Sequence, residues 1–170
     1  MLGARANLQV RLGRANDADR LSEVFAETWR HAYCGIIPHV HLQLMIRRRR
    51  PQWWRTAVRS RDSVIVLDFE RVVVGYATCG PSRTGGNYSG EIYEIYLLPD
   101  YQGVGFGEHL FEACRIRLDD RRLRGLIVWA LSENINAAAF YMGRGGRPMT
   151  TTFERLGGKR VEKTAYVWDD

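Results

Sequence analysis

The stretch EIYEIYLLPDYQGVGFGEHLF, residues 91–111, determines how the rest of the chain is interpreted, because it joins three kinds of local structure. Alternating apolar residues followed by proline predict a strand over 91–99. An apolar stripe predicts an amphipathic helix over 108–122, which begins near Phe106. In the glycine-rich turn between them, the first helical amides lack intrahelical partners, and glycine lets an anion approach several amides at once. The turn is therefore a predicted phosphate-binding site.

Two familiar phosphate-binding motifs do not fit this turn. A P-loop requires Lys followed by Ser or Thr, whereas Gly107 is followed by Glu108 and His109. The dinucleotide-binding fingerprint requires G-x-G-x-x-G, whereas the glycines here are spaced G-x-G-x-G, and the next apolar strand ends in Ser132 rather than in an acid. The pattern alone thus leaves two interpretations open, a phosphate site of another kind or an ordinary loop.

Strand and helix patterns alternate on both sides of this stretch, and no repeat or linker interrupts them. The order of predicted elements is β-α-α-β-β-β-α-β-α-β-β, which requires at least one parallel crossover. We therefore expect one domain over residues 1–170. The other predicted elements are a strand over 8–14, a helix that Asn16 or Asp17 caps and Gly35 ends, a helical segment over 39–59 interrupted at Pro51, a hairpin of 63–69 and 71–77, a strand over 125–132, a helix over 133–145 and a hairpin over 147–168 that turns at Gly157 and Gly158.

Composition and charge exclude several protein classes. The 170 residues are 45% hydrophobic and 26% charged, which is typical of a globular chain and not of a disordered one. The apolar runs are far shorter than the roughly 20 residues that cross a bilayer, and residues 1–14 lack the apolar core of a secretory signal. We therefore expect a cytoplasmic protein with no membrane partner. The net charge of +6 suits a polyanionic cofactor as well as a nucleic acid.

The three cysteines, Cys34, Cys79 and Cys114, are widely spaced, without a C-x-x-C pair or a histidine cluster nearby. An odd number of cysteines at such spacing predicts neither a disulfide framework nor a structural zinc site. We expect all three thiols to be reduced and buried, and we expect no metal.

Two motifs resemble the GNAT superfamily of acetyl-CoA-dependent N-acetyltransferases. The residues that match its Q/R-x-x-G-x-G/A signature are Gln102, Gly105 and Gly107, and those that match its N-x-x-A-x-x-F-Y motif are Asn134, Ala137, Phe140 and Tyr141. One departure is that the x-x-x-G-F that usually follows the tyrosine is absent. The order of elements extends the resemblance to nearly the whole chain. It implies an α/β (α+β) fold of the GNAT type, whose mixed, mostly antiparallel sheet of about seven strands, with four helices, is splayed between strands four and five.

The resemblance also implies acetyl-CoA as the co-substrate, without a metal. The amides of residues 103–108 would hold the pyrophosphate, the strand before the turn would pair through its backbone with the pantetheine arm, and Asn134 would contact the arm from the other side. The residues implied to bind coenzyme A are Tyr96, Leu97, Leu98, Gln102, Gly103, Val104, Gly105, Phe106, Gly107, Glu108, Asn134, Ala137 and Phe140.

Acyl transfer to an amine needs a neutral nucleophile and a protonated leaving thiol. Two acids of the predicted strand, Glu91 and Glu94, could accept the amine proton directly or through a water molecule, and we favour Glu91. Strict alternation places them on opposite faces of the strand, unless a bulge lies between them. The phenol of Tyr141 is the predicted proton donor to the thiolate. The bland alternatives are two solvated glutamates and a packed tyrosine.

The segment WRHAYCGIIP, residues 29–38, is similar to a stretch that many bacterial GNAT proteins carry between their first two helices. By that resemblance, Trp29 and Tyr33 would border the acceptor pocket; otherwise they are core aromatics. The arginines of 47–50 are predicted to form a solvated helix face, and a nucleic-acid patch is the disfavoured reading.

These features together predict an N-acetyltransferase that acts directly on a primary amine of a small molecule or peptide. The alternative is a non-catalytic coenzyme A-binding module that serves as a sensor or in assembly. The C-terminal hairpin could support a homodimer. The identity of the acceptor stays open, because the segments that would form its wall carry the least specific patterns.

Overall fold

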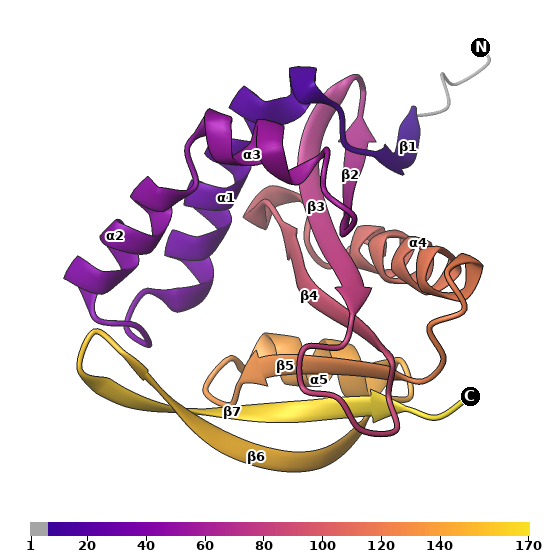
Figure 1. Ribbon diagram of the computed structural model, residues 1–170. Coiled ribbons are helices and arrows are strands. Elements are labelled where there is room, and N and C mark those ends of the chain that lie inside the picture. Colours follow the sequence, from indigo (N-terminus) through magenta and orange to yellow (C-terminus); the bar gives the residue numbers. More distant parts are fainter. Residues whose placement is uncertain (1–6) are drawn as a thin grey trace.

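Seven strands form one continuous sheet in the computed structural model of the protein, which describes residues 7–170 (Figure 1). The strand order is β1-β2-β3-β4-β5-β7-β6, and every neighbouring pair is antiparallel except β4 and β5. The predicted mixed, mostly antiparallel sheet is therefore confirmed. The strands are β1 (Leu8–Leu12), β2 (Ser63–Phe69), β3 (Val72–Pro81), β4 (Gly90–Leu97), β5 (Leu126–Leu131), β6 (Arg147–Leu156) and β7 (Lys159–Trp168).

Helices cover both faces of this sheet. In Figure 1, α1, α2 and α3 lie on one side of β2, β3 and β4, and α4 lies on the other side. The helices are α1 (Ala18–Tyr33), α2 (His39–Arg48), α3 (Pro51–Ala57), α4 (Phe106–Asp120) and α5 (Ile135–Gly143), and short 3₁₀ turns span Ala15–Asp17 and Pro99–Tyr101.

The expected four helices are five in the structure, because the helical segment predicted over 39–59 is two separate helices. Arg50 has an extended backbone with φ −68° and ψ 166°, and Pro51 begins α3. A residue before proline is pushed out of the helical region, whereas proline itself fits the first helical position, where its missing N–H costs nothing. A proline that was predicted to interrupt one helix therefore starts a new one.

The sheet splays between β4 and β5. These strands pair only over Gly90–Ile92 and Leu126–Val128, and beyond those residues they diverge (Figure 1). The predicted splay between strands four and five is confirmed. It leaves the second half of β4 without a neighbouring strand on that side.

A bulge in β4 decides which way its acidic side chains point. Cys79 of β3 pairs with Ile92, but the next residue, Thr78, pairs with Glu94, so Tyr93 is the extra residue. Glu91 and Glu94 therefore oppose residues two apart on β3, and they share one face of the sheet. Strict alternation, which would have separated them, does not hold here.

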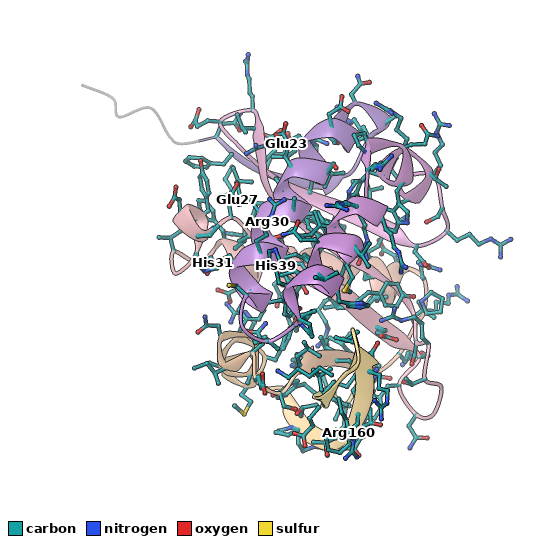
Figure 2. The ribbon with its side chains drawn as sticks, turned by 90° about the vertical axis from the view of Figure 1, so that its left-hand side faces the viewer. Glu23, Glu27, Arg30, His31, His39 and Arg160 are labelled. Atoms are coloured by element: carbon teal, nitrogen blue, oxygen red, sulfur yellow. The ribbon has the colours of Figure 1, made fainter. Side chains whose placement is uncertain are left out.

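The core lies between the sheet and the helices on each side. The apolar stripe of α1 is buried against β2–β4, and that of α4 is buried on the opposite face; the buried members of these stripes are Leu21, Val24, Phe25, Thr28 and Trp29 of α1 and Leu110, Phe111, Cys114 and Leu118 of α4. Figure 2 shows Glu23, Glu27 and Arg30 along the outer side of α1. Both amphipathic patterns are thus confirmed.

Two further expectations meet different outcomes. Cys79 and Cys114 are buried, but Cys34 is exposed, because it lies in the turn just after α1. The expectation that all three thiols are buried is therefore wrong for Cys34. None of the helices within residues 7–170 has both the length and the apolar character of a bilayer-spanning helix. Part of the N-terminal stretch considered as a secretory signal lies outside the described residues.

Candidate active site

The turn before α4 presents backbone amides that the protein does not use. Gly105 caps α4 with φ +89°, and Gly103 has φ +76°, so both occupy the left-handed region that glycine adopts without strain. A Cβ at either position would meet no atom within 4 Å. Within residues 7–170, no loop or cap hydrogen bond is donated by the amides of 103–108. These open amides, at the positive end of a helix, form a ready site for an anion.

Gly107 has a different role, because its backbone packs closely on α5. A Cβ there would lie 2.8 Å from Cε2 of Phe140, which is closer than real Cβ contacts occur. The Phe140 ring therefore rests against the first turn of α4. The two motifs identified in the sequence thus lie against each other in space.

A cleft of about 590 Å³ runs from this turn along the open edge of β4. It is lined by the predicted residues Tyr96, Leu97, Gln102, Gly103, Gly105, Gly107, Asn134, Ala137, Phe140 and Tyr141, and also by His31, Ala32, Ile95, Asn136 and Arg144. The predicted residues that line this cleft come from the end of β4, the turn, the first turn of α4 and α5. The splay and the two motifs therefore make one continuous groove.

Side chains already hold parts of this groove in place. Gln102 donates from Nε2 to the carbonyl of Leu97 at 2.9 Å. The Oδ1 atom of Asn134 accepts from the amide of Ala137 at 3.2 Å and caps α5, which leaves its amide nitrogen as a donor. Gln102 thus fixes the turn to the strand end as well as lining the cleft.

Four of the predicted coenzyme A residues do not line the cleft with their side chains. Val104 and Glu108 are exposed, and the ring of Phe106 packs 5.4 Å from that of Phe69. Leu98 is buried, and its amide donates to the carbonyl of Val74 at 2.9 Å. Val104, Phe106 and Glu108 can act only through their backbone amides, and the amide of Leu98 is already used by β3.

A second cavity, of about 710 Å³, opens on the other side of Tyr96. Trp29 and Tyr33 line it, as the sequence comparison implied. Tyr96 lines both cavities, so the two spaces meet at this side chain. The residues missed by the sequence reasoning that line the second cavity include Met45, Arg49, Gln52, Trp53, Arg83, Tyr93, Trp129, Glu154 and Lys163.

Glu94 is the acid of β4 that lines the second cavity. Arg49 holds its carboxylate through both nitrogens, with Nη2 2.6 Å from Oε1 and Nη1 2.9 Å from Oε2. Thr78 donates to Oε2 at 3.4 Å. The Glu94 side chain is only 9% exposed, and each oxygen retains a lone pair toward the cavity. Glu94 can therefore still accept a hydrogen bond from a bound amine.

Arg49 is fixed as firmly as Glu94. Its guanidinium carbon lies 4.6 Å from the ring centre of Phe25 and 4.2 Å from that of Trp53. Burial disfavours its charge, but the Glu94 carboxylate outweighs this and raises the pKa of Arg49. The guanidinium thus stays charged and keeps the carboxylate in place.

Glu91 lies outside both cavities. Its side chain is 1% exposed and accepts from Nη2 of Arg83 at 2.7 Å and from the Arg83 backbone amide at 2.8 Å. These bonds tie the loop after β3 to the start of β4. The geometry gives Glu91 a structural partner and gives Glu94 access to the cavity.

Buried tyrosines surround the point where the cavities meet. The hydroxyls of Tyr33 and Tyr96 are hydrogen-bonded to each other. Burial, opposed by this hydrogen bond and reinforced by the charge of Glu94, raises the pKa of Tyr33 to about 12. Tyr141 lines the cleft, and burial, with the nearby Tyr33 second, raises the pKa of its phenol. These phenols therefore keep their protons at neutral pH.

Arg144 is a cationic residue of the cleft that the motifs did not indicate. Its guanidinium lies 3.7 Å from the ring centre of Phe140, and it donates from Nη1 to the Phe140 carbonyl at 3.2 Å. Its buried Nε has no partner within residues 7–170. The one sequence signal was its place at the end of the predicted helix over 133–145.

The geometry agrees with comparisons to known proteins. The family model described as "Acetyltransferase (GNAT) family" matches residues 20–145. The chain belongs to the GNAT acetyltransferase family. A GNAT relative from Bacillus subtilis (strain 168), the uncharacterized N-acetyltransferase YuaI, is 28% identical over 163 residues, which cover 95% of this chain and 92% of the relative. Membership of the GNAT family makes the protein an acyltransferase with an amine acceptor.

Solved structures share the GNAT fold. The PaiA N-acetyltransferase from Thermoplasma acidophilum, in complex with coenzyme A, has a TM-score of 0.76 at 16% identity and covers 92% of this chain and 98% of its own. YncA from Salmonella typhimurium, with its cofactor acetyl-CoA, has a TM-score of 0.70 at 17% identity and covers 96% of this chain and 94% of its own. At these identities, the similarity is one of fold.

Proposed function

We propose that this GNAT protein transfers the acetyl group of acetyl-CoA directly to a primary amine of a small molecule or peptide. The observation that carries the proposal is that Tyr96 lines two cavities at once. One contains open amides suited to phosphate, and the other contains a buried carboxylate suited to an amine. Direct transfer needs this arrangement, because the amine and the thioester must meet without an intervening wall.

The cleft residues fit coenzyme A. The amides of 103–108 would hold the pyrophosphate, and the unpaired edge of β4 would hydrogen-bond the pantetheine arm. Asn134 would donate to the arm from α5. Arg144 adds a positive charge, whose unpartnered Nε is suited to a phosphate oxygen. When bound, acetyl-CoA supplies the activated acetyl group.

Glu94 and Tyr141 would move the protons. The amine nitrogen forms a bond to the carbonyl carbon of the thioester, and the carbon–sulfur bond breaks. Glu94 accepts the amine proton, directly or through a water molecule, and Tyr141 donates a proton to the departing sulfur. The buried Tyr141 gives up its proton only to a strong base, and a thiolate leaving into a buried cleft is such a base. We therefore assign the base role to Glu94 in preference to Glu91.

Release of free thiol from acetyl-CoA tests the proposal. Purified protein with acetyl-CoA should release thiol well above the rate without acceptor when a suitable amine is added, and mass spectrometry should find that amine acetylated. The panel would contain polyamines, amino acids, aminoglycosides and peptides with free N-termini or lysines. Coenzyme A binding without thiol release on any of these would instead support the non-catalytic module.

A further inference from the structure

Five arginines surround the acceptor cavity without any carboxylate to neutralise them. Residues 45–62, MIRRRRPQWWRTAVRSRD, supply much of the cavity wall through Met45, Arg49, Gln52, Trp53, Thr56, Ala57, Ser60 and Asp62. Of the seven arginines in this segment, Arg49 pairs with Glu94 and Arg55 with Asp19. The other five are exposed, and within residues 7–170 no carboxylate lies within 4.0 Å of them: Arg47, Arg48, Arg50, Arg59 and Arg61.

These five residues, the arginine rim, interleave with the residues that line the cavity. Arg59 and Arg61 flank Ser60, which is itself a lining residue, and Arg50 lies between Arg49 and Gln52, which also line it. Arg83 reaches the same cavity from the loop after β3, and its side chain is 64% exposed. An acceptor that enters the cavity therefore passes a strongly positive margin.

The inner end of the cavity has the opposite character. There the charge of Arg49 is matched by Glu94, and the carboxylate retains lone pairs for an amine. A molecule that fits both ends carries its amine at one end and negative charge beyond it. Purely cationic acceptors, such as polyamines or aminoglycosides, would meet repulsion at the rim.

We infer that the acceptor is an acidic peptide segment that presents a free amine, with the amine directed to Glu94 and its carboxylates lying along the arginine rim. The inference rests on the proposed function. A peptide is favoured over a small acid because the rim extends along α2, α3 and the turn after α3. The seven residues of α3 alone span about 10 Å, which is too far for a single carboxylate to cover.

Three short peptides of equal length test the inference. Each has the same free N-terminal amine, followed by glutamate, glutamine or lysine at the same positions. In the thiol-release assay, the glutamate peptide should have a KM about tenfold below that of the glutamine peptide, and the lysine peptide the highest KM. The difference should shrink between about 0.02 M and about 0.3 M salt, because the Debye length falls.

A pair of double variants locates the effect. Arg59→Gln with Arg61→Gln should raise KM for the glutamate peptide about fivefold and leave kcat within about twofold, because these residues lie at the margin and not at the reacting atoms. Arg124→Gln with Arg160→Gln removes the same charge elsewhere and should leave KM unchanged. Figure 2 shows Arg160 on the C-terminal hairpin, away from α1, and Arg124 lies in the loop before β5.

The outcomes separate this inference from the proposed function. Equal KM values for the three peptides, or a lower KM for spermidine than for the glutamate peptide, would overturn the inference while leaving the acetyltransferase intact. Binding of labelled single-stranded RNA more tightly than the glutamate peptide would also overturn it, since the rim would then serve a nucleic acid. Absence of thiol release with every amine would instead contradict the proposed function, and direct peptide binding by fluorescence anisotropy would still test the rim.

Discussion

Replacing Glu94 by glutamine should lower kcat/KM for the amine acceptor about 100-fold, a loss of about 2.7 kcal/mol of transition-state stabilisation. Glutamine keeps the size of the side chain and can still accept a hydrogen bond from Arg49, but it cannot take a proton from the amine. Steady-state kinetics with acetyl-CoA and the best acceptor of the panel measure the effect. The affinity for coenzyme A should change little, because Glu94 does not line the coenzyme A cleft.

Two further variants make the Glu94 result specific. Glu112→Gln, an equal change on the exposed side of α4, should leave the kinetics unchanged. Glu91→Gln should lower the free energy of unfolding by about 1–3 kcal/mol, because it weakens a charged hydrogen-bonded pair with Arg83. If folded Glu91→Gln lost as much kcat/KM as Glu94→Gln, or if Glu94→Gln stayed within threefold of the wild type, our choice of base would be wrong.

Replacing Tyr141 by phenylalanine should lower kcat about 100-fold and leave the Kd for coenzyme A within about twofold. The ring still packs against Phe140 and Trp168, so only the proton donor is lost. Because burial raises the pKa of this phenol, ionisation of Tyr141 should not produce a fall in wild-type activity between pH 7 and about pH 10. A pH–rate profile of both proteins, with thermal unfolding as a check on folding, measures these effects.

Tyr166 supplies the matched control for Tyr141. Its ring lies 5.7 Å from that of Tyr141 and is also buried, but it lines neither cavity. Tyr166→Phe should therefore retain kcat. Full activity in Tyr141→Phe would move the acid role elsewhere, and the hydrogen-bonded hydroxyls of Tyr33 and Tyr96 would be the next group to test.

The sequence predicted the elements whose evidence is local. The strand, turn and helix over 91–122 carry their own periodicity and glycines, and the structure confirms β4 and α4 there. The two helices in 39–59 were harder to separate, because whether Pro51 interrupts a helix or begins one depends on the backbone of Arg50. Local patterns thus gave the order of elements more reliably than their exact number.

The site depended on features that no local pattern records. The bulge at Tyr93 is a matter of register between β3 and β4, so the common face of Glu91 and Glu94 could not be read from alternation. Only one of four consecutive arginines, Arg49, turns inward, and its partner Glu94 is 45 residues away. Likewise, Lys163 reaches the acceptor cavity only because β7 pairs with β5.

The central claim is that the open amides before α4 hold the pyrophosphate of coenzyme A, and a crystal structure of the protein with coenzyme A tests it most directly. We expect pyrophosphate oxygens about 2.7–3.2 Å from several backbone nitrogens of residues 103–108, and the pantetheine arm along β4 toward Tyr96. Coenzyme A bound elsewhere, or pyrophosphate in contact with side chains alone while these amides face water, would contradict the account.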